Sequence, residues 1–269
     1  MTVHLVGAGP GDPELITRRG AALLARAAHV VYDRPSMAGL LALAPDATRH
    51  CVGKQRGVPA PPQQEINALL IELGRTRTCV VRLKAGDPFV VSRGGEEAVA
   101  LTGAGVDVEV VPGVSAAVAA PAAAGIPVMV RQLSRTLTVV AANDDPAYPG
   151  EVDWSALARL GGTVVLLTGR SALRGITTAL RAGGMPGDTP VAAISAATRP
   201  QQRAVRGTLD APPDPRLPAP LTVVIGDVAA LDVTALATVG PDVVGSAAPG
   251  PDVAARADGP AAEVRRAHS

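Results

Sequence analysis

A glycine-rich loop over residues 6–15 is the first candidate binding element. It has the sequence V-G-A-G-P-G-D-P-E-L and follows an apolar run. Gly7, Gly9 and Gly11 have no Cβ and tolerate positive φ, so that a ligand can approach their backbone. Pro10 removes one amide donor, and the loop lacks the third glycine of the dinucleotide fingerprint. The loop therefore predicts a site for a nucleotide-like ligand that is not held by its phosphates.

The helix expected after this loop begins with acidic residues. Asp12 is predicted to cap the helix, Pro13 to occupy its first position and Glu14 to lie in its first turn. Negative charge at this place repels an anionic ligand. The sequence therefore favours a neutral or cationic ligand for the loop.

Further polar residues follow two predicted strands. Asp33 comes directly after the apolar run 29–32, and K-A-G-D at 84–87 follows the run 78–83. Ligands of α/β folds bind at the carboxyl ends of parallel strands, so Asp33 is a candidate general base. A turn or a helix N-cap beside Pro35 explains Asp33 equally well from the residues alone. The loop 84–87 is expected to face the same ligand as the glycine-rich loop.

Composition excludes several classes of partner. The 25 basic and 24 acidic residues leave a net charge of +1, which argues against nucleic acid and anionic membranes. Only 1% of the residues are aromatic, so stacking surfaces for single-stranded nucleic acid are lacking. The scattered histidines and the two cysteines have no metal-ligand spacing. Neither an export signal nor a membrane-spanning segment is predicted.

Alternating strand and helix patterns predict an α/β fold of two domains with a cofactor cleft between them. In the first half the expected strands are 3–6, 29–32, 78–83 and 106–111, and the helices 13–26, 62–74 and 94–103. In the second half the expected strands are 136–141, 163–168, 190–194 and 221–225, and the helices 153–160 and 171–182.

The predicted domains cover 1–128, with the glycine-rich loop, and 129–236, which completes the cofactor pocket. Five prolines in 211–220 predict an extended connection. Residues 237–269 lack aromatic residues and a helical period, which predicts a disordered tail.

Seven motifs occur in the order and nearly the spacing of a known family. They are G-A-G-P-G-D-P at 7–13, Y-D-R at 32–34, V-G-K at 52–54, V-V-R-L-K-A-G-D-P-F at 80–89, R-G-G-E-E at 93–97, V-V-P-G-V-S at 110–115 and A-G-I-P at 124–127. Together they resemble the uroporphyrinogen-III C-methyltransferases of the tetrapyrrole methylase superfamily, from residue 2 to about residue 230.

The resemblance implies a cytoplasmic homodimer with the tetrapyrrole methylase fold. It implies transfer of two methyl groups from S-adenosylmethionine to C2 and C7 of uroporphyrinogen III, giving precorrin-2 by way of precorrin-1 in cobalamin or sirohaem biosynthesis. In-line methyl transfer requires no metal. Two alternatives stay open: a sister methyltransferase for a later precorrin, and a catalytically weak regulatory paralogue that binds S-adenosylmethionine.

The resemblance also gives roles to individual residues. Asp33 matches the family's proton acceptor, and Lys54 matches its proposed proton donor, although an isolated lysine is usually a solvated surface charge. Arg93 matches a functionally important arginine. A guanidinium effectively never deprotonates, so Arg93 is expected to anchor substrate and stabilise charge.

Uroporphyrinogen III carries eight carboxylates, which calls for guanidinium forks. Arg34 and Arg131 are therefore expected to bind substrate beside Arg93. Glu96 is expected to orient Arg93, or else to be an ordinary acid in the first turn of a helix. A solvated charge in the linker between the domains is the alternative interpretation of Arg131.

The cofactor contacts that the resemblance implies are Pro10, Ala85, Gly86, Asp87, Val90, Ser115, Ala116, Thr168 and Ala197. Val90 and Ala116 are equally well explained as core residues. The sequence departs from the family at Ala85, where a glycine is usual, and at Thr168, where a methionine is usual. Residues 195–198 replace a Glu-Asn-Gly-Thr segment, so the C-terminal wall of the pocket is expected to be altered.

Overall fold

The structure is a computed structural model that describes residues 2–34, 37–53, 60–76, 78–142, 152–167, 171–214 and 216–236. Residues 1–231 form one compact unit. Of the second unit, 232–269, the structure describes one short helix, α8 (Val233–Leu236). Lys54, Thr168 and the predicted tail 237–269 lie outside the described residues.

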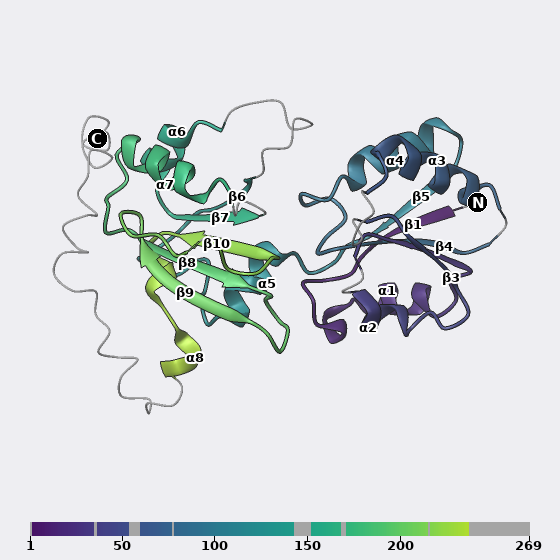
Figure 1. Cartoon of the computed structure of the whole chain (residues 1–269), viewed down its shortest axis with the longest axis horizontal. Coiled ribbons are helices and arrows are strands. Elements are labelled where there is room, and N and C mark those ends of the chain that lie inside the picture. The colour runs from purple at the N-terminus through teal and green to yellow at the C-terminus, as the bar shows by residue number, and fades with distance from the viewer. Residues whose placement is uncertain are drawn as a thin grey trace, which may run out of the picture. The chain divides into compact units, whose positions relative to one another are not determined.

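A parallel five-stranded sheet is formed by the first half of the larger unit (Figure 1). Its strands are β1 (Thr2–Gly7), β2 (His29–Tyr32), β3 (Thr48–Cys51), β4 (Val80–Lys84) and β5 (Asp107–Val111), in the order β3-β2-β4-β1-β5. The helices of this half are η1 (Pro13–Leu15), α1 (Arg18–Leu24), α2 (Ala38–Leu41), α3 (Gln63–Gly74) and α4 (Gly94–Gly103). Apolar side chains of α1 and α2 pack on one face of the sheet, and those of α3 and α4 pack on the other.

The helix predicted over 13–26 is two helices. The Asp12 carboxylate accepts from the Glu14 amide at 2.9 Å and caps the 3₁₀ helix η1, as predicted. The chain then becomes extended at Ile16, and the Thr17 hydroxyl caps α1. Two capping side chains in succession begin two helices, because each satisfies the free amides of its own first turn.

A mixed five-stranded sheet is formed by the second half of the unit (Figure 1). Its strands are β6 (Leu137–Ala141), β7 (Thr163–Leu167), β8 (Pro190–Ser195), β9 (Arg203–Thr208) and β10 (Leu221–Ile225), in the order β6-β7-β10-β8-β9. Strand β6 is parallel to β7, whereas β10 is antiparallel to both β7 and β8, and β8 is antiparallel to β9.

The helices of the second half are α5 (Ala116–Ala123), α6 (Trp154–Leu160), α7 (Leu173–Ala182) and η3 (Asp227–Ala230). Side chains of α6 and α7 pack on one face of the mixed sheet, and those of α5 pack on the other. Among the described residues of 211–220 there is no helix or strand. The predicted α/β class is confirmed, while the domain boundaries stay predictions.

The parallel sheet determines where the candidate site lies. Strands β1, β2, β4 and β5 all end at one edge, and the predicted loops leave from that edge. Residues far apart in sequence therefore meet there, as the expected ligand position at the carboxyl ends of parallel strands requires. No helix of the described ranges has both the length and the apolar character to cross a lipid bilayer.

Candidate active site

The two predicted ligand loops lie against each other. The amide of Ala8 donates to the Lys84 carbonyl at 2.7 Å. Gly9 and Gly86 exchange two backbone hydrogen bonds, of 3.2 and 2.8 Å. The loop after β1 and the loop after β4 therefore form one backbone-paired unit, which is in line with the expectation that both face one ligand.

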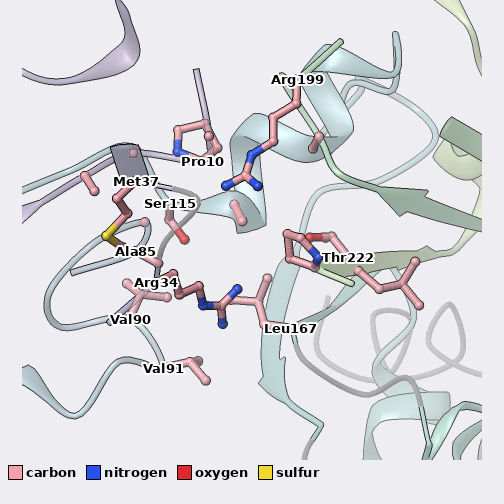
Figure 2. A pocket seen from close by; sticks show the side chains of 18 of the residues that line it. Pro10, Arg34, Met37, Ala85, Val90, Val91, Ser115, Leu167, Arg199 and Thr222 are labelled. Carbon is pink, nitrogen blue, oxygen red and sulfur yellow. The ribbon is translucent and has the colours of Figure 1, made fainter. Parts of the chain in front are cut away.

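A pocket opens beside this paired unit, and residues of both sheets line it (Figure 2). The predicted cofactor contacts among its lining residues are Pro10, Ala85, Gly86, Val90, Ser115, Ala116 and Ala197. Lining residues that the sequence reasoning missed include Met37, Leu167, Ile194, Arg199, Leu221 and Thr222. We call this pocket the glycine-loop pocket.

Asp87 is absent from the described lining of this pocket. Its carboxylate accepts from the Phe89 amide at 2.8 Å and from the Gly113 amide at 3.1 Å. Asp87 therefore joins the loop after β4 to the loop after β5. Its place in the structure is that of a residue that shapes the loops around the pocket.

A second pocket lies next to the first and shares Arg34, Ala85 and Val91 with it. Its lining is strongly polar and also includes Asp33, Gln63, Arg82, Lys84, Ser92 and Arg93. The structure thus brings together Asp33, Arg34 and Arg93, three of the residues predicted for catalysis and substrate binding. We call this pocket the charged pocket.

Two other predicted residues lie elsewhere. Glu96 is an exposed acid in the first turn of α4, and Arg131 is exposed after α5. Neither is among the described lining residues of the two pockets. The placement of Glu96 matches the alternative reading of an ordinary first-turn acid.

Four ionisable side chains form a connected cluster beneath the charged pocket. Arg82 Nη2 donates to Asp33 Oδ1 at 2.5 Å and to Glu97 Oε1 at 2.9 Å. Lys84 Nζ donates to Glu97 Oε2 at 2.7 Å. We call Asp33, Arg82, Lys84 and Glu97 the charge cluster. Its two cations and two anions balance, which buried charges require.

The charge cluster arises from strand alternation. Residues two apart on a strand point to the same face, so Arg82 and Lys84 leave one face of β4 while Val81 and Leu83 enter the apolar core on the other. Arg82 and Lys84 are 2% and 1% exposed, and Glu97 on α4 is 0% exposed. Gln63 Nε2 also donates to Glu97 Oε1, at 3.3 Å. Asp33, Arg82 and Lys84 all line the charged pocket, and of the three Asp33 is the most exposed.

The pKa values of the two cations of the cluster are shifted in opposite directions. Burial alone would lower the pKa of Arg82, but the carboxylates of Asp33 and Glu97 outweigh it and raise that pKa above its ordinary value. For Lys84, burial and the charge of Arg82 together lower the pKa, against the opposing effect of Glu97 and Asp33. Arg82 is therefore the permanent cation that holds Asp33 in place.

The backbone at Asp33 also depends on a close approach by Gly53. A Cβ on Gly53 would lie 1.3 Å from the Asp33 carbonyl oxygen. The amide of the preceding residue, Val52, donates to the Tyr32 carbonyl at 2.9 Å. Only glycine allows the two chain segments to run this close together.

Arg93 has a left-handed backbone, with φ of 58°, at the start of α4. Val91 has φ of 54°, which is rare for a β-branched residue. Residues held in this region cost stability and concentrate at functional sites. The loop 91–93 is thus held in an unfavourable conformation at the edge of the charged pocket.

Comparison with known proteins agrees with this geometry. The sequence profile of the tetrapyrrole (corrin/porphyrin) methylases matches residues 2–213. Two α/β halves that meet at a pocket beside a glycine-rich loop define this class, and the chain belongs to the tetrapyrrole methylase family.

Individual relatives are more specific. An S-adenosyl-L-methionine-dependent uroporphyrinogen III methyltransferase of Methanosarcina barkeri is 41% identical over 232 residues, which are 84% of this chain and 91% of that protein. A siroheme synthase of Gluconacetobacter diazotrophicus is 42% identical over 84% of this chain and 49% of its own length.

A solved structure shares the fold. The uroporphyrin-III C-methyl transferase of Thermus thermophilus, complexed with S-adenyl homocysteine, aligns with a TM-score of 0.73 and 36% identity, over 85% of this chain and 98% of that chain. These relatives confirm the predicted resemblance to uroporphyrinogen-III C-methyltransferases. Among the described residues no group of three or more His, Cys, Asp or Glu side chains is placed to hold a metal ion.

Proposed function

We propose that this chain methylates uroporphyrinogen III with S-adenosylmethionine as the methyl donor, at C2 and then C7, and so forms precorrin-2 by way of precorrin-1. One observation carries the proposal: the glycine-loop pocket, with seven of the predicted cofactor contacts, adjoins the charged pocket that holds Asp33, Arg34 and Arg93. A donor site and an acceptor site for a polycarboxylate are thus neighbours. The names of the relatives support S-adenosylmethionine-dependent methylation of uroporphyrinogen III.

The residues of the glycine-loop pocket fit such a donor. Gly9 and Gly86 have φ of 75° and 66° and present backbone without a side chain. Apolar side chains of Met37, Leu40 and Leu167 form walls suited to a nucleoside. When bound, S-adenosylmethionine supplies an electrophilic methyl group.

The residues of the charged pocket have separate tasks in this proposal. Asp33 accepts the proton that the macrocycle loses from another of its atoms after a ring carbon has been methylated, and Arg82 keeps the Asp33 carboxylate oriented. Arg93 and Arg34 pair with carboxylates of the macrocycle, because a guanidinium fork binds a carboxylate through two hydrogen bonds. Lys54 as proton donor and Thr168 as cofactor contact are further parts of the proposal, as are Glu96, Arg131 and Asp87 in their predicted roles.

The proposal extends to a cytoplasmic homodimer in cobalamin or sirohaem biosynthesis, as the family resemblance implies. The similarity to a siroheme synthase supports the sirohaem route. Size-exclusion chromatography with light scattering tests the dimer.

A turnover assay with the purified full chain tests the function. S-adenosylmethionine and enzymatically generated uroporphyrinogen III are expected to give a product with two added methyl groups, detected by mass spectrometry. Methylation of a later precorrin alone would identify the sister methyltransferase instead. Binding of S-adenosylhomocysteine without turnover of either substrate would identify the regulatory paralogue.

A further inference from the structure

Two arginines that are far apart in the sequence, Arg34 and Arg199, both extend into the glycine-loop pocket. Arg34 follows β2, and Arg199 lies in the turn between β8 and β9. Figure 2 shows the guanidinium groups of both side chains directed into the pocket. Among the described lining residues they are the only charged side chains, and both are positive. Asp12 and Glu14, on which the expectation of a neutral or cationic ligand rests, are not part of this described lining.

The position of Arg199 is built into the glycine-rich loop. A Cβ on Gly11 would lie 2.5 Å from Arg199 Nε and 3.0 Å from Arg199 Cγ. The missing side chain at Gly11 therefore makes room for the arginine as well as for a ligand.

Hydrogen bonds fix the turn that carries Arg199. The hydroxyl of Thr198 accepts from the Asp12 amide at 3.0 Å, which ties the turn to the glycine-rich loop. The Thr198 amide donates to Gln202 Oε1 at 2.7 Å, and Gln202 Nε2 donates to the Ala123 carbonyl at 2.7 Å. Arg199 is thus held at the pocket by contacts on both sides.

Two guanidinium groups that face one pocket repel each other, and an anion bound between them offsets that repulsion. Burial and the charge of Arg34 lower the pKa of Arg199. A carboxylate is the anion that a planar guanidinium binds best, because two parallel hydrogen bonds form.

We propose that Arg199, together with Arg34, binds a carboxylate in the glycine-loop pocket. This inference rests on the proposed function, which offers two sources of that carboxylate: the amino-acid end of the adenosyl ligand and an acid side chain of the tetrapyrrole. The predicted cofactor contacts are mainly apolar residues and backbone groups, which do not distinguish a ligand with this carboxylate from one without it. Arg199 then makes that distinction.

Calorimetric titration of the full chain with two probes tests the proposal. S-adenosylhomocysteine carries the amino-acid carboxylate, and 5′-methylthioadenosine lacks the whole amino-acid group. Arg199→Ala is expected to weaken S-adenosylhomocysteine binding by about tenfold or more, as loss of a charged hydrogen bond does, and to change the affinity for methylthioadenosine by less than about twofold. Arg203→Ala, an exposed arginine of β9, is the matched control and should change neither affinity.

A second variant, at Gly11, displaces the Arg199 side chain without removing it. Gly11→Ala places a methyl group where Arg199 lies, so it should lower S-adenosylhomocysteine affinity; because Gly11 also lines the pocket, only a greater loss for S-adenosylhomocysteine than for methylthioadenosine supports the role of Arg199. If Arg199→Ala leaves both affinities unchanged but raises the KM for uroporphyrinogen III about tenfold at constant kcat, the carboxylate is the substrate's.

An equal loss of affinity for both probes would overturn the proposal, because Arg199 would then only shape the pocket. No change in either affinity or in KM would also overturn it. Failure of the wild-type chain to bind S-adenosylhomocysteine would remove the proposed function and this inference together. Normal wild-type binding with an unselective Arg199 variant would remove only the inference.

Discussion

The two sheets bury their central strands in different surroundings. Strand β4 of the parallel sheet is fully buried although it contains Arg82 and Lys84. Strand β7 of the mixed sheet is equally buried and is apolar except for Thr163. Even paired, buried charges often stabilise a fold less than well-packed apolar side chains of similar volume, so the first sheet gives up stability that the second sheet keeps. The chemistry of the site lies on the first sheet, while Leu167 and its neighbours on the second provide an apolar wall.

The largest effect is expected where the charge cluster loses an acid. Glu97→Gln leaves two buried cations, Arg82 and Lys84, and only one carboxylate, that of Asp33, to balance them. The free energy of unfolding should therefore fall by about 3–5 kcal/mol. Chemical denaturation measures it. Glu96→Gln, on the exposed side of the same helix turn, is the matched control and should stay within about 0.5 kcal/mol.

The mixed sheet offers the corresponding test of a neutral buried polar group. Thr163→Val removes a hydroxyl that donates to Ser134 Oγ at 2.7 Å, and it should cost only about 1 kcal/mol. Similar losses for Glu97→Gln and Thr163→Val would break the contrast between the two sheets.

The second prediction separates chemistry from binding. Asp33→Asn keeps the shape of the side chain but removes the proposed base, so the methylation rate should fall by about a hundredfold or more. S-adenosylhomocysteine affinity should change by less than about twofold, because the glycine-loop pocket does not include Asp33. Single-turnover assays and calorimetry measure the two quantities. Near-normal turnover would return Asp33 to a structural role beside Arg82.

The third prediction concerns the guanidinium group of Arg93 at the edge of the charged pocket. Arg93→Lys keeps the charge but loses the paired donors, so kcat/KM for uroporphyrinogen III should fall by about tenfold. The same change at Arg203, an exposed arginine of β9 with no proposed role in the site, is the matched control and should leave kcat/KM unchanged. Equal activity of the Arg93 variant and the wild type would show that charge alone suffices.

The smallest effect is expected in the turn after β8. Ala196 has φ of 47°, a conformation that costs a residue with a Cβ about 1–2 kcal/mol. Ala196→Gly should therefore stabilise the fold, by less than about 1 kcal/mol after the entropy loss of glycine. Ala204→Gly on the exposed strand β9 should destabilise it instead. Thermal unfolding compares the two, and a loss of stability in the Ala196 variant would contradict the strain argument.

Sequence patterns predict the fold well where local signals are strong. Apolar runs followed by turn residues locate β1, β2, β4 and β5, and hence the edge at which the loops meet. Strand β3 is not predicted, because T-R-H-C at an edge of the sheet has no apolar alternation. Helix α5 is not predicted either: its alanines give no period, and Pro121 lies inside it.

The candidate site is predicted less completely, since side-chain pairing is not a local property. Asp33 and Arg93 are identified by motif, but Arg82 and Glu97 become a pair only when β4 packs against α4. A signal was present in the alternation of Arg82 and Lys84 with apolar residues in a strand expected to be buried. Arg199 gave no such signal, because its contact with Gly11 joins residues at the two ends of the unit.

The contact between Gly53 and Asp33 has a consequence for how this sequence can evolve. No residue with a side chain fits at position 53 while the Asp33 carbonyl keeps its course. Position 53 therefore cannot vary independently, because its residue type is constrained by the backbone of Asp33, which directly follows the neighbouring strand β2. In a saturation-mutagenesis library, Gly53 should tolerate substitution as poorly as the catalytic residues do, although none of its atoms takes part in the reaction.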